Sequence, residues 1–192
     1  MHENNNGTTP KSRFTELRSE TVVLQPLTED DITATYADWL NDPKVVRYSN
    51  QQFIRHSLES CRQYLDSFRN TDNMLLKISH GTPKTFVGTM SLYFQPHHQT
   101  VDIGIMIGHR PVWGRGIGQE AWNTILHWLL HQPDIRKITA GTMRCNLGMV
   151  AILRRSGMQC EAVRHAQELL DGTPQDLVHY SIFSRNETDL PK

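Results

Sequence analysis

Two periods of apolar residues alternate along this chain. Short apolar runs bounded by turn residues predict strands, and apolar positions three and four apart predict amphipathic helices. The predicted strands cover residues 21–27, 74–79, 85–94, 100–107 and 135–141, and two more surround a turn at 170–174. The predicted helices run from Thr28 to Leu40, from Ser57 to Arg69, from Ile117 to Pro133, and from Leu147 to Ser156. The order β-α-α-β-β-β-α-β-α-β-β predicts an α/β protein.

Local end signals support two of these helices. Thr28 with Asp31 three residues later nearly matches a capping box, so we expect the first helix to start there. Gly157 follows the last helix at the C′ position, where glycine readily adopts the left-handed conformation.

A glycine-rich segment joins the strand at 101–108 to the helix that ends at Pro133. Gly114, Gly116 and Gly118 stand at alternate positions, so backbone amides there can approach an anion with no Cβ in the way. The helix that follows adds unpaired N–H groups and a partial positive charge. This arrangement predicts a phosphate site, and a pyrophosphate in particular.

Two familiar phosphate loops do not match this segment. The pattern G-x-x-x-x-G-K-[ST] occurs nowhere in the chain. The dinucleotide pattern G-x-G-x-x-G fails because Gly118 comes one residue too early, and the loop lies beyond the middle of the chain. A shorter type of phosphate loop is therefore required.

Length and composition narrow the class of protein. A chain of 192 residues fits one domain, which we place at residues 20–185, with a mobile N-terminal arm at 1–19 and a tail at 186–192. The chain has no apolar run near the ~20 residues of a membrane span and no apolar leader, so we expect no membrane partner. With 20 acidic and 20 basic residues, we expect no nucleic-acid partner. Cys61, Cys145 and Cys160 show no C-x-x-C spacing, which favours reduced thiols in a cytoplasmic protein.

Two segments resemble signatures of the GNAT N-acetyltransferase superfamily. Residues 104–122 resemble its acetyl-CoA-binding motif [QR]-x-x-G-x-[GA], which falls on Trp113, Gly116 and Gly118. Trp113 replaces the usual Gln or Arg, a departure common in the branch that resembles the RimJ/RimL ribosomal-protein acetyltransferases. Residues 146–158 resemble a second pattern, N-x-x-[SA]-x-x-x-[YL]-x-x-x-G-[FM]. The alternative for the first segment alone is an ordinary strand-to-helix turn.

The resemblance implies a fold and a cofactor site. The fold is a mixed, mostly antiparallel sheet, splayed between its fourth and fifth strands, with helices on both faces. Acetyl-CoA is implied as co-substrate, with its pantetheine arm on backbone groups of Met106 and Ile107 and its thioester beside Asn146. The residues implied for the pyrophosphate are Arg115, Gly116, Ile117 and Gly118. Asn146 also suits a helix N-cap, and both roles can hold together.

The resemblance also implies a catalytic group. An amine attacks a thioester only when neutral, so a base must take its proton. Asp102 matches the position where many family members carry an acidic base, often acting through water; the alternative is a solvent-facing strand residue. A backbone N–H of the fourth strand can stabilise the oxyanion. Leu153 stands where many relatives have a tyrosine that protonates the thiolate, so water or the acceptor must replace that donor.

The acceptor is the open question at this stage. The segment 45–56 borders the acceptor cleft in this family, and four of its residues are candidate acceptor ligands: Arg47, Tyr48, Arg55 and His56. The arginines and His56 suit a phosphate, which favours a small amine such as a nucleotide-linked amino sugar. Glu168, Asp171 and Asp176 favour a cationic protein N-terminus, as in a RimJ/RimL-like enzyme. A CoA-binding regulatory module without turnover is the third alternative.

No metal site is expected. His127 and His131 lie four residues apart on a predicted helix but lack the Glu of H-E-x-x-H and a third ligand. The sequence leaves open whether the protein is a monomer or a homodimer.

Overall fold

One eight-stranded sheet organises the molecule. The computed structural model describes residues 9–184, and its strands follow the order β1-β2-β3-β4-β5-β6-β8-β7. The strands are β1 Leu17–Arg18, β2 Val22–Pro26, β3 Met74–His80, β4 Thr85–Gln95, β5 Thr100–Ile107, β6 Lys137–Met143, β7 Gln159–Leu170 and β8 Thr173–Phe183. Neighbouring strands pair antiparallel except β5 and β6, which pair parallel. The predicted mixed, mostly antiparallel sheet is confirmed.

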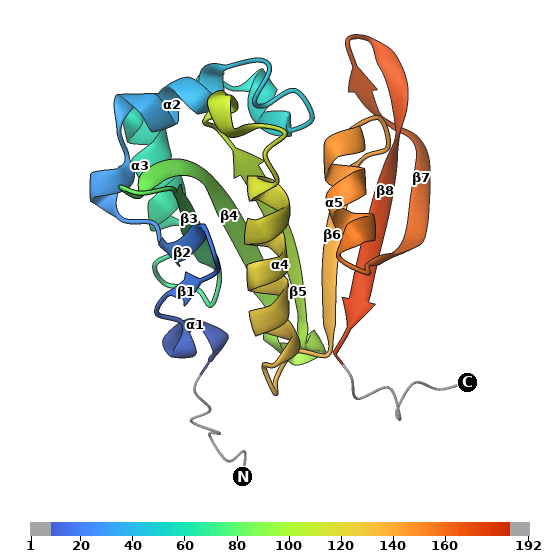
Figure 1. Cartoon of the computed structure of the whole chain (residues 1–192). Coiled ribbons are helices and arrows are strands. Elements are labelled where there is room, and N and C mark those ends of the chain that lie inside the picture. Colours follow the sequence, from blue (N-terminus) through green and yellow to red (C-terminus); the bar gives the residue numbers. More distant parts are fainter. Residues whose placement is uncertain (1–8, 185–192) are drawn as a thin grey trace.

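Five α-helices accompany the sheet in the described part of the chain (Figure 1). They are α1 Pro10–Arg13, α2 Ala34–Asn41, α3 Leu58–Asp66, α4 Ile117–Leu130 and α5 Leu147–Arg155. Short 3-10 turns lie at Glu29–Asp31, Asn50–Phe53, Pro96–His98 and Arg110–Val112. Apart from α1 and β1, the order of strands and α-helices agrees with the sequence pattern.

Alternation along the strands produces two apolar clusters, one on each face of the sheet. In β3, Leu76 contributes to the cluster that contains α4 and α5, where Trp122 and Leu153 are fully buried. Leu75 contributes to the other cluster, which contains Tyr36 of α2 and further residues of α3. The two helix pairs therefore cover opposite faces, as expected.

The N-terminal prediction needs correction for residues 10–18. We expected a mobile arm as far as Ser19, but these residues form α1 and β1. Phe14 is 7% exposed and packs edge-on against Trp128, with the ring centroids 5.2 Å apart. Arg13 pairs with Asp134. An aromatic anchor and an ion pair fix this segment on the end of α4. Residues 1–8 and the predicted tail at 186–192 lie outside the described residues.

The first predicted helix divides into two pieces. The Thr28 backbone N–H donates to Asp31 Oδ2 at 2.9 Å, so the capping box exists but closes only a 3-10 turn. Lys77 Nζ, on β3, also donates to Asp31 at 2.9 Å, which ties this turn to the sheet. The helix α2 starts later, with Thr33 as its N-cap.

Glu120 connects the first turn of α4 to the start of β2. Its carboxylate accepts hydrogen bonds from Ser19 Oγ at 2.7 Å, Thr21 N at 2.7 Å, Thr21 Oγ1 at 2.6 Å and Val22 N at 3.2 Å. Burial raises the pKa of Glu120, but the donors of Thr21 and Ser19 outweigh burial and hold that pKa below its usual value. The ionised carboxylate is therefore part of the fold.

We expect Glu120→Gln to lower the free energy of unfolding at pH 7 by about 1–3 kcal/mol, because an amide meets the same four donors without the charge. Glu59→Gln, at an exposed position on α3, is the matched control and should change it by less than about 0.5 kcal/mol. Because the folded pKa is lowered, the contribution exists above the unfolded pKa and disappears as the pH falls through the folded value. Urea unfolding at pH 7 and at acidic pH measures both effects; equal midpoints for the two variants would contradict this role.

Candidate functional site

The parallel strands β5 and β6 part soon after they begin. Only three residue pairs join them, namely Thr100 with Lys137, Val101 with Ile138, and Asp102 with Thr139. Beyond the last pair the strands separate, and Figure 1 shows them meeting at one end and diverging toward the other, with α4 and α5 on either side. The predicted splay between these strands is confirmed, and Asp102 marks the point where it opens.

Glycines flank the opening on the face that carries Asp102. Asp102 and Thr139 pair across β5 and β6. Because residues two apart in a strand lie on the same face, Gly104 of β5 and Gly141 of β6 follow them on that face. A Cβ added at Gly104 would lie 2.9 Å from Ser91 Oγ, and one added at Gly141 would lie 3.3 Å from His179 Nδ1. At these two positions neither strand carries a side chain, and we call this part of the opening, beside Asp102, the passage.

Asp102 is a partly desolvated carboxylate at this passage. Its Oδ2 accepts a hydrogen bond from Thr139 Oγ1 at 2.7 Å. Although the side chain keeps contact with solvent, desolvation by the surrounding protein raises its pKa; the Thr139 hydroxyl and the nearby His179 lower the pKa without cancelling that effect. A carboxylate with a raised pKa is a stronger proton acceptor than an ordinary surface aspartate.

Two tyrosines lie on the other side of Asp102. Tyr93 of β4 is the cross-strand partner of Asp102, and its hydroxyl lies 2.8 Å from that of Tyr64 on α3. Burial raises the pKa of Tyr64, and the hydrogen bond to Tyr93 adds to that shift. The Tyr64 hydroxyl therefore stays protonated near neutral pH, and its hydrogen bond holds the Tyr93 hydroxyl in place.

The glycine-rich loop has the backbone that the sequence predicts. Gly114 and Gly116 have φ values of +74° and +84°, and a Cβ added at either position would meet nothing within 4 Å. Gly116 is the N-cap of α4, so the amides of Ile117 and Gly118 belong to the first turn and lack intrahelical acceptors. Arg115 is exposed beside them. This loop forms an open cradle of N–H groups suited to a phosphate.

The end of β5 differs in detail from the expectation. The Met106 carbonyl is directed at β4, since a Cβ added at Gly88 would lie 2.2 Å from it. The Ile107 carbonyl accepts a hydrogen bond from Trp113 Nε1 at 2.7 Å. Trp113, at the position usually held by Gln or Arg, thus anchors the loop to the strand. Because strand residues alternate, the backbone of Ile105 and the Ile107 N–H face the opening instead of Met106.

Asn146 occupies the start of α5 as an N-cap. Its side chain accepts from Met149 N at 3.3 Å and donates to Thr142 Oγ1 at 3.1 Å. The N-cap role, expected as the alternative for Asn146, is therefore present. The residue lies just after the end of β6, beside the opening. Leu153 is fully buried in the core, so its side chain has no contact with solvent.

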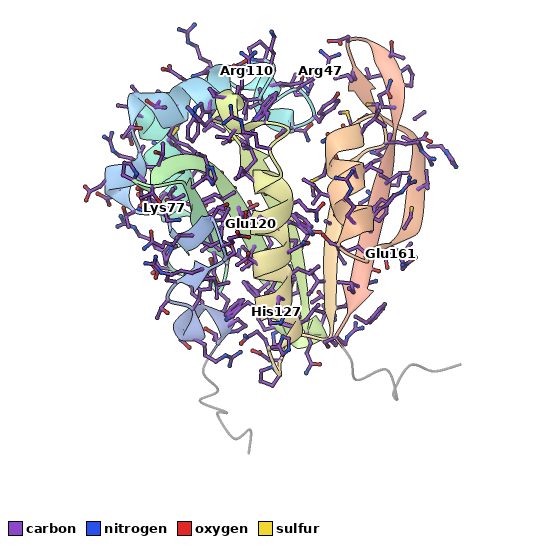
Figure 2. All side chains as sticks on the ribbon, viewed as in Figure 1. Arg47, Lys77, Arg110, Glu120, His127 and Glu161 are labelled. Carbon is purple, nitrogen blue, oxygen red and sulfur yellow. The ribbon has the colours of Figure 1, made fainter. Side chains whose placement is uncertain are left out.

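The candidate acceptor ligands do not form one cationic cluster. Arg47 Nη2 lies 2.7 Å from Asp171 Oδ2, so an ion pair joins the segment between α2 and α3 to the β7–β8 turn (Figure 2). Tyr48 and Arg55 are exposed. The backbone of His56 is held by Asn41, whose side chain accepts from His56 N and donates to His56 O, each at 2.9 Å. Arg47 is therefore paired with Asp171 in this structure, and an anionic acceptor that binds Arg47 must first displace this exposed carboxylate.

Sequence reasoning missed several residues at the opening: Ser91, Tyr93, Gly104, Gly141 and His179. The only signal was a shared spacing, Asp102-x-Gly104 and Thr139-x-Gly141. That spacing becomes informative only when the parallel register between β5 and β6 is known.

Several negative findings apply to residues 9–184. No cluster of three or more His, Cys, Asp and Glu side chains could hold a metal there. None of the helices in that range is long and apolar enough to cross a membrane. Cys61, Cys145 and Cys160 are free thiols, of which Cys61 is buried and Cys160 exposed.

Comparisons with known proteins agree with this geometry. Residues 21–159 match the model of the acetyltransferase (GNAT) domain. The chain is 21% identical over 170 residues to the probable N-acetyltransferase YjcK of Bacillus subtilis, covering 83% of this chain and 92% of that protein. A structure of RimL, a ribosomal L7/L12 alpha-N-protein acetyltransferase, in complex with coenzyme A superposes with a TM-score of 0.76 at 18% identity, covering 88% and 97% of the two chains. Spermidine N-acetyltransferase from Vibrio cholerae, in complex with CoA and spermine, gives a TM-score of 0.76 at 16% identity, covering 86% and 97%.

Proposed function

Since this chain belongs to the GNAT acetyltransferase family, we propose that it transfers an acetyl group from acetyl-CoA to the primary amine of a small molecule. The amine attacks directly, in a ternary complex. The observation that carries the proposal is the glycine-lined passage at the point where β5 and β6 part, with the Asp102 carboxylate beside it.

The cofactor side of the proposal rests on α4, α5 and the strand ends. The amides of Gly116, Ile117 and Gly118 and the Arg115 side chain would hold the pyrophosphate, because positive φ and open space at Gly114 and Gly116 leave those amides accessible. Asn146 would lie beside the thioester end of acetyl-CoA. Acetyl-CoA supplies an activated acyl group, and the protein binds its pyrophosphate and positions its thioester.

The catalytic side uses few groups. Asp102 would accept the proton of the attacking ammonium, directly or through water, and its raised pKa suits this task. A backbone N–H of β5 that faces the opening would stabilise the oxyanion. Leu153 supplies no proton to the thiolate, so another group must do so.

The acceptor we favour is a small amine that carries no required phosphate. The argument for a nucleotide-linked amine depended on a free Arg47, and the ion pair with Asp171 weakens that argument. The carboxylate of Asp102 attracts an ammonium, and the glycines admit a slim group. Amino sugars and aliphatic amines both satisfy these conditions.

The test is an acetylation panel. The protein is incubated with acetyl-CoA and one acceptor at a time: aliphatic diamines and polyamines, amino sugars, and peptides with free N-termini. Thiol release is followed, and the products are identified by mass spectrometry. We expect release with at least one small amine, above the rate without an acceptor. Binding of acetyl-CoA with no release for any amine would contradict an enzymatic role and favour the regulatory alternative.

A second candidate is acetylation of a protein N-terminus, in the manner of RimJ/RimL. One observation favours it: large apolar side chains are exposed on both segments joined by the Arg47–Asp171 pair. Phe53 and Ile54 are 72% and 56% exposed, and Leu169 is 58% exposed. Such a surface suits the apolar side chains of a peptide better than a small polar amine. Faster acetylation of peptides than of every small amine in the panel would select this candidate.

A further inference from the structure

His179 of β8 lies over the passage without being fixed by a hydrogen bond. It is the cross-strand partner of Gly141, and a Cβ added at Gly141 would lie 3.3 Å from its Nδ1 and 3.4 Å from its Cε1. The imidazole therefore lies over Gly141 of β6, so close that a Cβ at that position would be in tight contact with the ring. Within the described residues its Nε2 is buried and has no hydrogen-bond partner. A buried polar nitrogen without a partner costs free energy and calls for an explanation.

Acidic groups approach His179 from two sides. Asp102 of β5 and Glu161 of β7 both interact with it electrostatically. Glu161 is compensated, since it pairs with Lys137 Nζ at 2.6 Å and accepts from Ser181 Oγ at 2.8 Å (Figure 2). Asp102 has only the Thr139 hydroxyl. The remaining titratable groups on this side, Tyr93 and Tyr64, bind each other. Among the described residues, Asp102 is therefore the carboxylate near the imidazole that has no cationic partner.

We propose that His179 is a catalytic acid–base residue of the acetyl transfer, taking the proton of the attacking amine and delivering it to the departing thiolate. The inference rests on the proposed function and deepens it. Asp102, in this arrangement, takes the proton of the bound ammonium, as proposed above, and His179 takes the second proton, which the nitrogen loses as it attacks.

The step is balanced without any further reactant. Asp102 first takes one proton from the bound ammonium and later releases it to solvent, with which its side chain is in contact. As the C–N bond forms, a second proton leaves the amine nitrogen for His179; as the C–S bond breaks, the imidazolium returns one proton to the sulfur. The products are the N-acetyl amine and the CoA thiol, and His179 ends neutral as it began. This role supplies the proton donor that the Leu153 side chain cannot provide, because an imidazole can both accept and donate a proton.

The first experiment compares His179→Gln with His165→Gln. Glutamine keeps size and hydrogen-bonding capacity but cannot carry the proton. His165, an exposed histidine of β7, is the matched control. Using the best amine of the panel, we expect kcat to fall about 10²–10³-fold in His179→Gln, with acetyl-CoA affinity and melting temperature unchanged, and no change in His165→Gln.

A second variant separates catalysis from structure. His179→Ala opens space beside Gly141, and added imidazole should restore turnover in proportion to its concentration, with the restored rate rising as imidazole becomes neutral. Loss of activity without rescue and with an unaltered pH profile would overturn the proposal in favour of a packing role. Wild-type turnover in a folded His179→Gln protein would overturn it and leave the acetyltransferase function intact. Absence of turnover in the wild-type protein with every amine would overturn the proposed function, and this inference with it.

Discussion

Gly116→Asp should remove acetyl-CoA binding while the protein stays folded. The side chain would enter the open space in front of the α4 amides, which is where the proposed pyrophosphate lies. Two like charges about 4 Å apart near a protein surface repel by about 4 kcal/mol, so the dissociation constant should rise at least about 10²-fold. Titration calorimetry measures it directly. Saturating acetyl-CoA should also stabilise the wild-type fold by roughly 2–4 kcal/mol, and the variant should show none of this stabilisation.

Gly116→Asn is the matched control for this prediction. Asparagine and aspartate are nearly equal in size, both tolerate positive φ, and both serve as N-caps. The two variants therefore share any backbone cost at φ +84° and differ mainly in charge. We expect the asparagine variant to bind acetyl-CoA far more tightly than the aspartate variant. Equal affinities would mean that no anion binds at this helix terminus.

Asp102→Asn should reduce turnover about 10²–10⁴-fold and leave acetyl-CoA affinity unchanged, because the amide keeps the shape of the carboxylate but neither accepts a proton nor attracts an ammonium. The deficit should shrink at high pH, where more of the acceptor amine is already neutral. Steady-state kinetics across pH, with calorimetry for the cofactor, measure both quantities. Wild-type turnover near neutral pH would assign Asp102 to structure alone.

Thr139→Val provides a pH test of the same carboxylate. Burial already raises the pKa of Asp102, and the Thr139 hydroxyl opposes that shift. Activity that needs ionised Asp102 appears as the pH rises through this raised pKa. Removing the hydroxyl should raise the pKa further, so the acidic limb of the profile should move to higher pH in Thr139→Val. An acidic limb that stays in place would show that another group controls it.

Much of the fold was accessible from local pattern. Alternation and helical spacing are properties of a single segment, so β3, β4, β5 and α4 were predicted close to their observed bounds. The glycine loop was predicted for the same reason, since its conformation depends on its own residues. The Thr28 helix start was wrong because Lys77, distant in sequence, holds Asp31 in a separate turn.

The candidate site was less accessible because it depends on pairings between distant segments. Asp102 was identified by resemblance, but the passage beside it requires the register that sets Thr139 opposite Asp102 and His179 opposite Gly141. Arg47 and Asp171, 124 residues apart, were assigned to competing acceptors and instead bind each other. Charge patterns along a sequence do not reveal which opposite charges meet in space.

The short ladder between β5 and β6 has a mechanical consequence. Three residue pairs join the two halves of the sheet at one end, and the exposed Arg47–Asp171 ion pair joins them beyond the other. An exposed ion pair contributes about 0–1 kcal/mol, so this distal tie is weak. Beyond the ladder the halves are held mainly by α4 against α5, where Gln119 Nε2 donates to Ser156 Oγ at 2.8 Å. A ligand bound between the halves would then keep β5 and β6 apart and restrict their motion relative to each other. Its arrival should slow amide hydrogen exchange in β6 and β8, far from the helix terminus that holds its phosphates.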